Sequence, residues 1–293
     1  MRAMVIANPT SGNGRCGKAI PEIQRILNEK GIRYSFFISR YSGYTEELAR
    51  KAKGDGFQMV VACGGDGTVN EVVNGIVGTG IILGIIPMGR GGDLASNLAI
   101  SKDIATAISN IHEGFFKNLD VVRVNGDRYY LGVGGIGFDS EVNRWVNEGL
   151  RFIRGKVAYT IAAIARIPVL KYKRVRISFD EGDFDGDILL VAFGNTRSYG
   201  GGMYITPDAE MDDGLLDICL IGKINRLRLL YVFPRVFRGT HTGVSGVMSY
   251  RSRHLSVESD TPLDLYGDGE FICKTPFSME VVPGVLNVIA PSG

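Results

Sequence analysis

The sequence predicts an N-terminal α/β domain with a parallel sheet, followed by a C-terminal antiparallel β-rich sandwich domain. Over the first 125 residues strand-like and helix-like periodicities alternate, whereas later segments are short and separated by turns. Alternating strands and helices are typical of a parallel sheet covered by helices, and short strands between turns are typical of an antiparallel domain. The change near Val124–Asp127 divides the chain into 1–125 and 126–293, and the last strand could return to the first domain.

The N-terminal alternation is regular enough to place each element. Two of its strands, MVVAC and ILGIIP, are apolar throughout, as expected for strands that are covered on both faces. Strand-like runs lie at 1–7, 34–39, 59–63, 82–87 and 119–124, with helical patterns at 18–31, 45–56, 68–77 and 101–114.

The C-terminal part contains short apolar stretches such as RYYLGVG, GDILLVAFGN and LLDICLIG. Two helical patterns interrupt them, near 139–168 and 225–238. Asp268 and Gly269 separate the alternating runs LDLY and EFIC, and Asp-Gly in such a position is a strong signal for a hairpin turn.

Bulk composition restricts the function. The 293 residues carry 33 basic and 31 acidic side chains, and a net charge of +2 argues against nucleic acid as the main partner. Four cysteines and three histidines are scattered, so a structural zinc site is not expected. The start does not resemble a signal peptide, and the longest apolar stretch, 157–170, is too short to cross a bilayer. We expect a soluble cytoplasmic protein, at most peripheral on the inner face of the membrane.

Residues 12–18, GNGRCGK, satisfy two phosphate-binding patterns incompletely. The dinucleotide pattern needs its first glycine at the strand end and an acidic residue about 20 positions later, but the second strand ends at Ser39-Arg40. The P-loop pattern needs Ser or Thr after the lysine, where Ala19 stands. A flexible strand-to-helix loop is the alternative. Small polar residues near a helix start could still offer N–H groups to an anion.

Residues 63–71, CGGDGTVNE, carry a stronger phosphate signal. Three glycines allow the backbone to approach a ligand without interference from a Cβ atom. Thr68 and Glu71 have the spacing of a capping box, which would begin a helix there. The helix would start at the carboxyl edge of a parallel sheet, where ligands bind. An ordinary turn is the alternative, but it needs only one glycine.

The motifs then become recognisable as a set. GGDGTVNEVVNG, at 64–75, resembles the nucleotide-binding motif of the diacylglycerol kinase catalytic-domain family of lipid kinases, and NPTSG, at 8–12, resembles its opening loop. NAD kinases and phosphofructokinases carry related GGD motifs. FGNTRSYGGGMYITPDAEMDDGLLDI, at 193–218, is similar to the family's C-terminal block, and GDGE, at 267–270, to its last catalytic motif. The matches span nearly the whole chain in the right order, and imply a fold like that of NAD and diacylglycerol kinases.

The resemblance implies ATP as a cofactor, bound between the two N-terminal motifs. The overlap with the dinucleotide pattern is then coincidental. The stretch PMGRGGDLA, at 87–95, departs from the family because Arg90 replaces a hydroxyl residue and Gly92 replaces an asparagine. Arg90 either contacts phosphate or is a solvated loop charge. The implied nucleotide neighbours are Asn8, Ser11, Gly12, Thr45, Gly64, Gly65, Asp66, Gly67, Thr68, Asn70, Glu71, Gly89 and Arg90.

Carboxylates supply the remaining chemistry. Phosphoryl transfer needs a group that takes the proton of the acceptor hydroxyl. The candidates are Asp66, Asp268 and Glu270, and the resemblance places the base in the GDGE motif without deciding between the last two.

The resemblance also implies a Mg²⁺ site formed by Glu210, Asp213 and the carbonyl of Leu215, with Asp120 joining through water. Hard oxygen ligands suit magnesium. From the residues alone, EMDDG is more simply interpreted as an acidic turn.

Two basic segments could contact a lipid surface. Residues 224–239 mix four arginines with large apolar side chains, and residues 170–176 read LKYKRVR. Basic amphipathic segments of this kind lie on anionic membranes. A solvated helix over a core is the alternative for each, and Pro234 would kink or end a helix.

Together these features predict an ATP- and Mg²⁺-dependent lipid kinase that phosphorylates a lipid hydroxyl, with diacylglycerol, giving phosphatidic acid, as the leading acceptor. The expected partner is a lipid alcohol at the membrane surface, and a homodimer is left open. One alternative is a kinase for a soluble acceptor such as NAD. Another is a nucleotide- or lipid-binding regulatory protein without turnover.

Overall fold

The computed structural model describes residues 1–137 and 171–291, so the helical pattern expected near 139–168 lies outside the described residues. The chain divides into two compact units. One consists of Met1–Val121 together with Pro283–Gly293, and the other of Val122–Val282.

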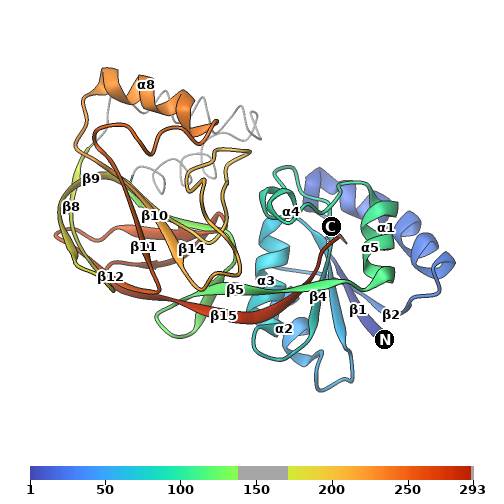
Figure 1. Ribbon diagram of the computed structural model, residues 1–293. Helices are drawn as coiled ribbons and strands as arrows, with labels where there is room; N and C mark the ends of the chain where they lie inside the picture. Colours follow the sequence, from blue (N-terminus) through green and yellow to red (C-terminus); the bar gives the residue numbers. More distant parts are fainter. Residues whose placement is uncertain (138–170, 292–293) are drawn as a thin grey trace. The chain divides into compact units, whose positions relative to one another are not determined.

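The first unit is built on a parallel sheet in the order β15–β4–β3–β1–β2. Helices cover both faces, with α1 and α5 on one side and α2 and α3 on the other (Figure 1). The strands are β1 (Arg2–Ala7), β2 (Arg33–Ile38), β3 (Met59–Gly64), β4 (Ile82–Pro87) and β15 (Phe277–Ile289). The helices are α1 (Ser11–Glu29), α2 (Tyr44–Lys51), α3 (Asp66–Ile76), α4 (Asp93–Asn97) and α5 (Ile104–Glu113).

Burial explains the apolar strands of this unit. Every residue of β3 is buried, and in β4 only the first residue is partly exposed. A strand with helices on both faces has no solvent side, so its sequence need not alternate. The prediction that both strands are covered on both faces is therefore confirmed.

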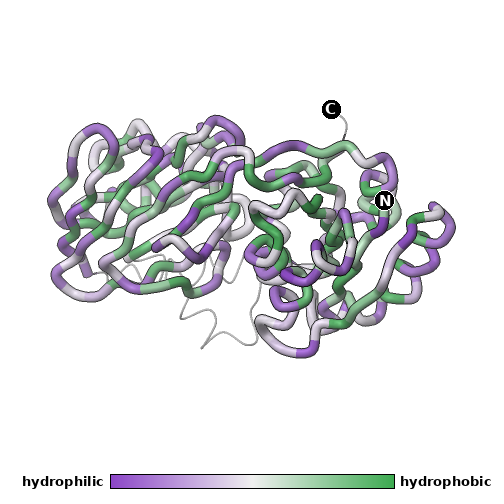
Figure 2. Tube along the Cα trace, turned by 90° about the horizontal axis from the view of Figure 1, so that it is seen from below, coloured by the Kyte–Doolittle hydropathy of each residue, from purple (hydrophilic) through white to green (hydrophobic). Residues whose placement is uncertain are grey.

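The second unit is antiparallel, in the order β14–β13–β7–β9–β8–β12–β15, with β10 and β11 paired beside β9. Buried and exposed residues alternate along β8 and β12, and Figure 2 shows hydrophobic and hydrophilic residues alternating along strands of this unit. The predicted fold class is confirmed. The elements are β5 (Phe116–Val124), which begins in the first unit, β6 (Arg128–Tyr130), β7 (Val133–Gly137), β8 (Lys173–Phe179), β9 (Asp183–Gly194), β10 (Leu216–Gly222), α8 (Arg226–Val236), β11 (Val247–Ser252), β12 (His254–Ser259), β13 (Asp264–Gly267) and β14 (Glu270–Lys274).

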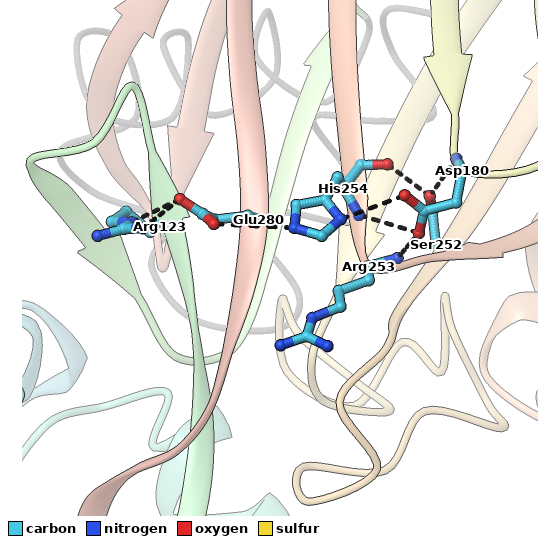
Figure 3. A network of polar contacts seen from close by, with 6 residues as sticks. All are labelled: Arg123, Asp180, Ser252, Arg253, His254 and Glu280. Carbon is cyan, nitrogen blue, oxygen red and sulfur yellow. Dashed lines mark hydrogen bonds and ion pairs between the residues drawn. The ribbon is translucent and has the colours of Figure 1, made fainter.

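A row of charged side chains crosses neighbouring strands of the second unit (Figure 3). Arg123 donates to Glu280 at 2.7 Å, and His254 lies 3.2 Å from Asp180 and 3.9 Å from Glu280. A pocket of about 390 Å³ lies beside the row. The charged residues that line the pocket already pair with one another. We therefore infer that this network holds the neighbouring strands together.

Among the described residues, no helix is both long and apolar enough to cross a membrane.

The packing of α2 against α3 generates a stability prediction. A Cβ atom on Gly75 would lie 2.5 Å from the Cβ of Ala49, so replacing Gly75 with alanine forces the two helices apart. We expect Gly75→Ala to lower the free energy of unfolding by about 1–3 kcal/mol, as overpacking usually does. Urea denaturation measures the change.

Gly54→Ala is the matched control, because the nearest atom to its added Cβ would be the Lys51 carbonyl oxygen at an ordinary 3.6 Å. Equal stability of the two variants would contradict the close packing of α2 and α3.

Candidate nucleotide-binding and phosphoryl-transfer site

The turn from β3 into α3 forms the centre of the candidate nucleotide site. Helix α3 begins at Asp66, and Gly65 is its N-cap residue in an extended conformation. The first N–H groups of a helix, here around Asp66, Gly67 and Thr68, have no acceptor within the helix. They carry the positive end of the helix dipole, which favours anions. The turn follows a parallel strand, so it offers these donors at the carboxyl edge of the sheet.

Two backbone loops touch at this edge. The N–H groups of Met88 and Gly89 donate to the carbonyl oxygen of Gly64 at 2.8 and 3.1 Å. A Cβ atom on Gly89 would lie 2.6 Å from the Cα of Gly65, so the contact requires glycine at that position. A surface of bare backbone results, with no side chain to separate it from a phosphate.

The opening loop joins the same turn. Asn8 donates its backbone N–H to Cys63 at 2.9 Å and its side-chain amide to the hydroxyl of Thr68 at 3.2 Å. Ser11 Oγ accepts the N–H of Gly65 at 3.3 Å. The structure therefore brings together the two N-terminal motifs that the sequence linked by resemblance.

Backbone conformation explains the first two glycines of GNGRCGK. Gly12, Asn13 and Gly14 are left-handed, with φ values of 62°, 60° and 81°. A Cβ atom on Gly12 would lie 2.3 Å from the Met88 carbonyl oxygen. The loop is thus held against the β4 end of the sheet, and the regular part of α1 begins only after Gly14.

The predicted capping box is wrong. Thr68 lies inside α3, and the carboxylate of Glu71 accepts the N–H groups of Gly43 and Thr45, at 2.8 and 3.2 Å. Glu71 therefore caps α2, because those N–H groups belong to its first turn and the residue before it. The prediction failed because a glutamate with the spacing of a capping box can also reach the N-terminus of a neighbouring helix.

Two further implied nucleotide neighbours are buried. Thr45 is 1% exposed and donates its hydroxyl to Ser39 at 3.0 Å, and Asn70 is 7% exposed. Burial of this degree leaves little of either side chain exposed for contact with a nucleotide. Arg90, by contrast, is exposed in the loop after β4.

Asp66 organises the loop that departs from the family pattern. Its carboxylate accepts the N–H of Gly92 at 3.2 Å. Burial raises the pKa of Asp66, while backbone N–H groups of the loop and the charge of Lys102 oppose that rise. Gly92 is left-handed, with a φ of 65°. Asparagine tolerates that conformation better than most residues, so replacing Asn by Gly preserves the backbone the loop requires.

The GDGE motif lies in the second unit, and the predicted hairpin is confirmed. Gly267 pairs with Glu270, and the two turn residues Asp268 and Gly269 have positive φ values of 51° and 84°. Positive φ at both positions is the pattern of a type I′ turn, for which Asp-Gly is favoured.

The hairpin distinguishes its two carboxylates. Both oxygens of Asp268 accept backbone N–H groups, from Leu131 at 2.9 Å and from Gly132 at 2.8 Å. Glu270 is exposed at the start of β14. Sequence analysis missed Gly132, where a Cβ atom would lie 2.5 Å from Asp268 Oδ1. Its only signal is the glycine-rich run LGVGG.

Two of the residues implied for a magnesium site have protein partners. Asp213 accepts the N–H of Leu215 at 3.0 Å, and its other oxygen pairs with Arg251. In the first unit, buried Asp120 accepts the N–H of Gly284 at 2.8 Å.

Glu210 is exposed. Across the described residues, no group of three or more His, Cys, Asp or Glu side chains is arranged to hold a metal ion. The side chains around Asp213 do not form a metal cage in this conformation, and the assignment of magnesium to these residues stays a prediction.

Comparison with known proteins agrees with this geometry. Residues 2–124 match the model of the diacylglycerol kinase catalytic domain, and residues 132–290 match that of the YegS C-terminal NAD kinase beta sandwich-like domain. A diacylglycerol kinase of Mycobacterium tuberculosis (strain H37Rv) is 33% identical over 99% of this chain and 95% of its own length. One from Staphylococcus saprophyticus is 32% identical over 99% of this chain and 96% of its own.

Solved structures give the same fold. A putative diacylglycerol kinase from Bacillus anthracis superimposes with a TM-score of 0.82 at 21% identity, covering 99% of this chain and 97% of that chain. A second crystal structure from the same organism has a TM-score of 0.81 at 22% identity, with the same coverage.

The position of Glu71 can be tested directly. We expect Glu71→Gln to lower the free energy of unfolding by about 1–2 kcal/mol, because one N–H group at the start of α2 loses its acceptor. Chemical denaturation measures this, and Glu29→Gln, at an exposed i,i+4 pair with Arg25, is the control and should change little. Wild-type stability combined with weaker nucleotide binding would instead return Glu71 to the nucleotide-contacting residues.

Proposed function

The chain belongs to the diacylglycerol kinase family and is a kinase, and from that premise we propose that it transfers the γ-phosphate of ATP, with Mg²⁺, to a lipid hydroxyl. We propose diacylglycerol as the acceptor and phosphatidic acid as the product. The observation that carries this choice is the similarity, over 99% of the chain, to proteins named diacylglycerol kinase. The enzyme would act from the cytoplasm on the inner face of the membrane.

The first unit supports the nucleotide half of this proposal. The α3 N-terminus lies beside the close glycine contact between the loops after β3 and β4, where a Cβ atom on Gly89 would clash with the backbone of Gly65. Ser11 and Asn8 border it. These backbone donors would bind the phosphates, and Mg²⁺ would supply charge neutralisation there. Arg90 is close enough in sequence to add a cation at the rim.

The second unit supports a division of roles within GDGE. We propose Glu270 as the base that takes the proton of the acceptor hydroxyl, because it is exposed at the start of β14. Asp268 is then a positioning residue. Its two bonds to backbone N–H groups fasten the hairpin to the segment at Leu131 and Gly132 and hold the neighbouring carboxylate in place.

One observation is a reason to test NAD, a soluble acceptor, beside the lipids. The model that residues 132–290 match is described as NAD kinase-like in its sandwich, so NAD is the acceptor to compare with a lipid. The regulatory alternative rested on the altered loop at 87–95. That support weakens, because Gly92 adopts a conformation that asparagine also tolerates and Asp66 holds the loop.

The defining experiment is a transfer assay. Purified protein, labelled ATP and Mg²⁺ are incubated with mixed micelles containing diacylglycerol, phosphatidylglycerol, a polyprenol or sphingosine, and separately with NAD. We expect label in diacylglycerol. Label in another lipid alone would reassign the acceptor, and label in NAD alone would overturn the lipid assignment. Nucleotide binding without any transfer would favour the regulatory alternative.

The two carboxylates of the hairpin should respond differently to substitution. Glu270→Gln should lower kcat by at least about 100-fold, the usual contribution of a general base, and leave the thermal midpoint and KM for ATP unchanged. Asp268→Asn should lower stability by about 1–3 kcal/mol, because one backbone N–H loses its acceptor. Steady-state kinetics and thermal unfolding measure both.

The opposite pattern would reverse the roles. If Asp268→Asn keeps wild-type stability and loses turnover, while Glu270→Gln remains active, Asp268 is the base.

A further inference from the structure

Helix α8 has one face in the core and one in solvent. Leu229, Val232 and Val236 are at most 6% exposed and pack in an apolar cluster with residues of β9, β10 and β11. On the opposite face Leu230 is 49% exposed and Tyr231 is 54% exposed. Figure 1 shows the helix lying along the border of the second unit. The outer face of a helix that is already packed on its inner face therefore exposes two adjacent large apolar side chains.

The charge on this helix is of one sign. Arg228 is exposed and Arg235 is partly exposed on α8, and Arg238, two residues after the helix ends, is also exposed. None of the ion pairs formed by the described residues involves these arginines. The chain also has no acidic residue between Asp217 and Glu258. The charges on this face are therefore available to an anionic partner.

The other basic segment is different. Lys173, Arg174 and Arg176 lie on β8, where Asp185 of the neighbouring strand pairs with Arg174 at 2.9 Å and with Arg176 at 3.6 Å. These arginines share an acidic partner within the sheet. In the described part of the chain, α8 therefore differs from β8 in that its arginines have no acidic partner and lie beside the exposed Leu230 and Tyr231.

The side chains of Tyr231 and Arg235 contact each other on the outer face of α8. The guanidinium carbon lies 4.2 Å from the ring centroid, and the guanidinium also donates to the tyrosine hydroxyl. Tyrosine rings suit the level of lipid headgroups, because one end is apolar and the other hydrated. A stacked arginine still has N–H groups for phosphate oxygens.

We propose that the outer face of α8 docks on an anionic lipid surface. Leu230 and Tyr231 would enter the headgroup region while Arg228, Arg235 and Arg238 bind lipid phosphates. Charge complementarity selects this partner, and two exposed apolar side chains are few for a stable dimer interface. The inference rests on the proposed function, since docking serves a kinase whose acceptor resides in a membrane.

The test compares two charge-matched double variants of the full chain. Vesicles of pure phosphatidylcholine, or with about a third phosphatidylglycerol, are sedimented with wild-type protein, with Arg228→Gln/Arg238→Gln, or with Arg174→Gln/Arg176→Gln. Each basic side chain near an anionic membrane contributes about fivefold to binding, so the α8 variant should bind phosphatidylglycerol vesicles about 25-fold more weakly. The β8 variant should bind like wild type. Leu230→Asn, with an unchanged thermal midpoint, should also bind more weakly.

Three outcomes would overturn the proposal. Wild-type protein could fail to bind phosphatidylglycerol vesicles, or both double variants could lose binding equally. Alternatively, the α8 substitutions could change the oligomeric state in light scattering without affecting vesicle binding, which would identify the face as a contact between copies of the chain.

A parallel assay separates this inference from the proposed function. Phosphorylation of a short-chain diacylglycerol that dissolves as a monomer does not require membrane docking. Activity there without vesicle binding would overturn the docking face alone. Vesicle binding without transfer to any lipid would overturn the proposed function alone.

Discussion

The backbone contact between Gly65 and Gly89 is the constraint on which the candidate nucleotide site depends. Parallel pairing of β3 with β4 runs to Gly64 opposite Pro87, so both strands end together and their loops must touch. Only a residue without a side chain at Gly89 permits that approach. The opening loop then packs against the same turn through Ser11. A site made of backbone depends less on the side chains around it, and the glycine contact is formed in this chain although the loop after β4 departs from the family pattern.

The sequence predicts the first unit well where burial alone decides the structure. Apolar β3 and β4 and the glycine turn between strand and helix follow from hydrophobic pattern and conformational freedom. It fails where a side chain chooses between partners distant in sequence. Glu71 has the spacing of a capping box, yet caps α2. Five-residue α4 was missed because one turn carries no measurable periodicity.

The second unit gives the same contrast. The hairpin at Asp268 was predictable because a type I′ turn requires positive φ, which Asp-Gly adopts readily. Its fastening to Leu131 and Gly132 was not, because those partners lie more than a hundred residues earlier. Likewise, the two basic segments look equivalent in sequence. Only strand pairing, which puts Asp185 beside β8, shows that the two arginines of one segment share an acidic partner.

Strand β15 has a consequence for biosynthesis. Its last residues, made after the whole second unit, complete the parallel sheet: Asn287 lies opposite Ile82, and Ile289 is buried in the core of the first unit. Chains emerge from the ribosome N-terminus first, and domains generally fold in that order. Here β4 of the first unit has no β15 partner until the whole second unit has been synthesised. Of the two units, the one whose synthesis begins first is therefore completed second.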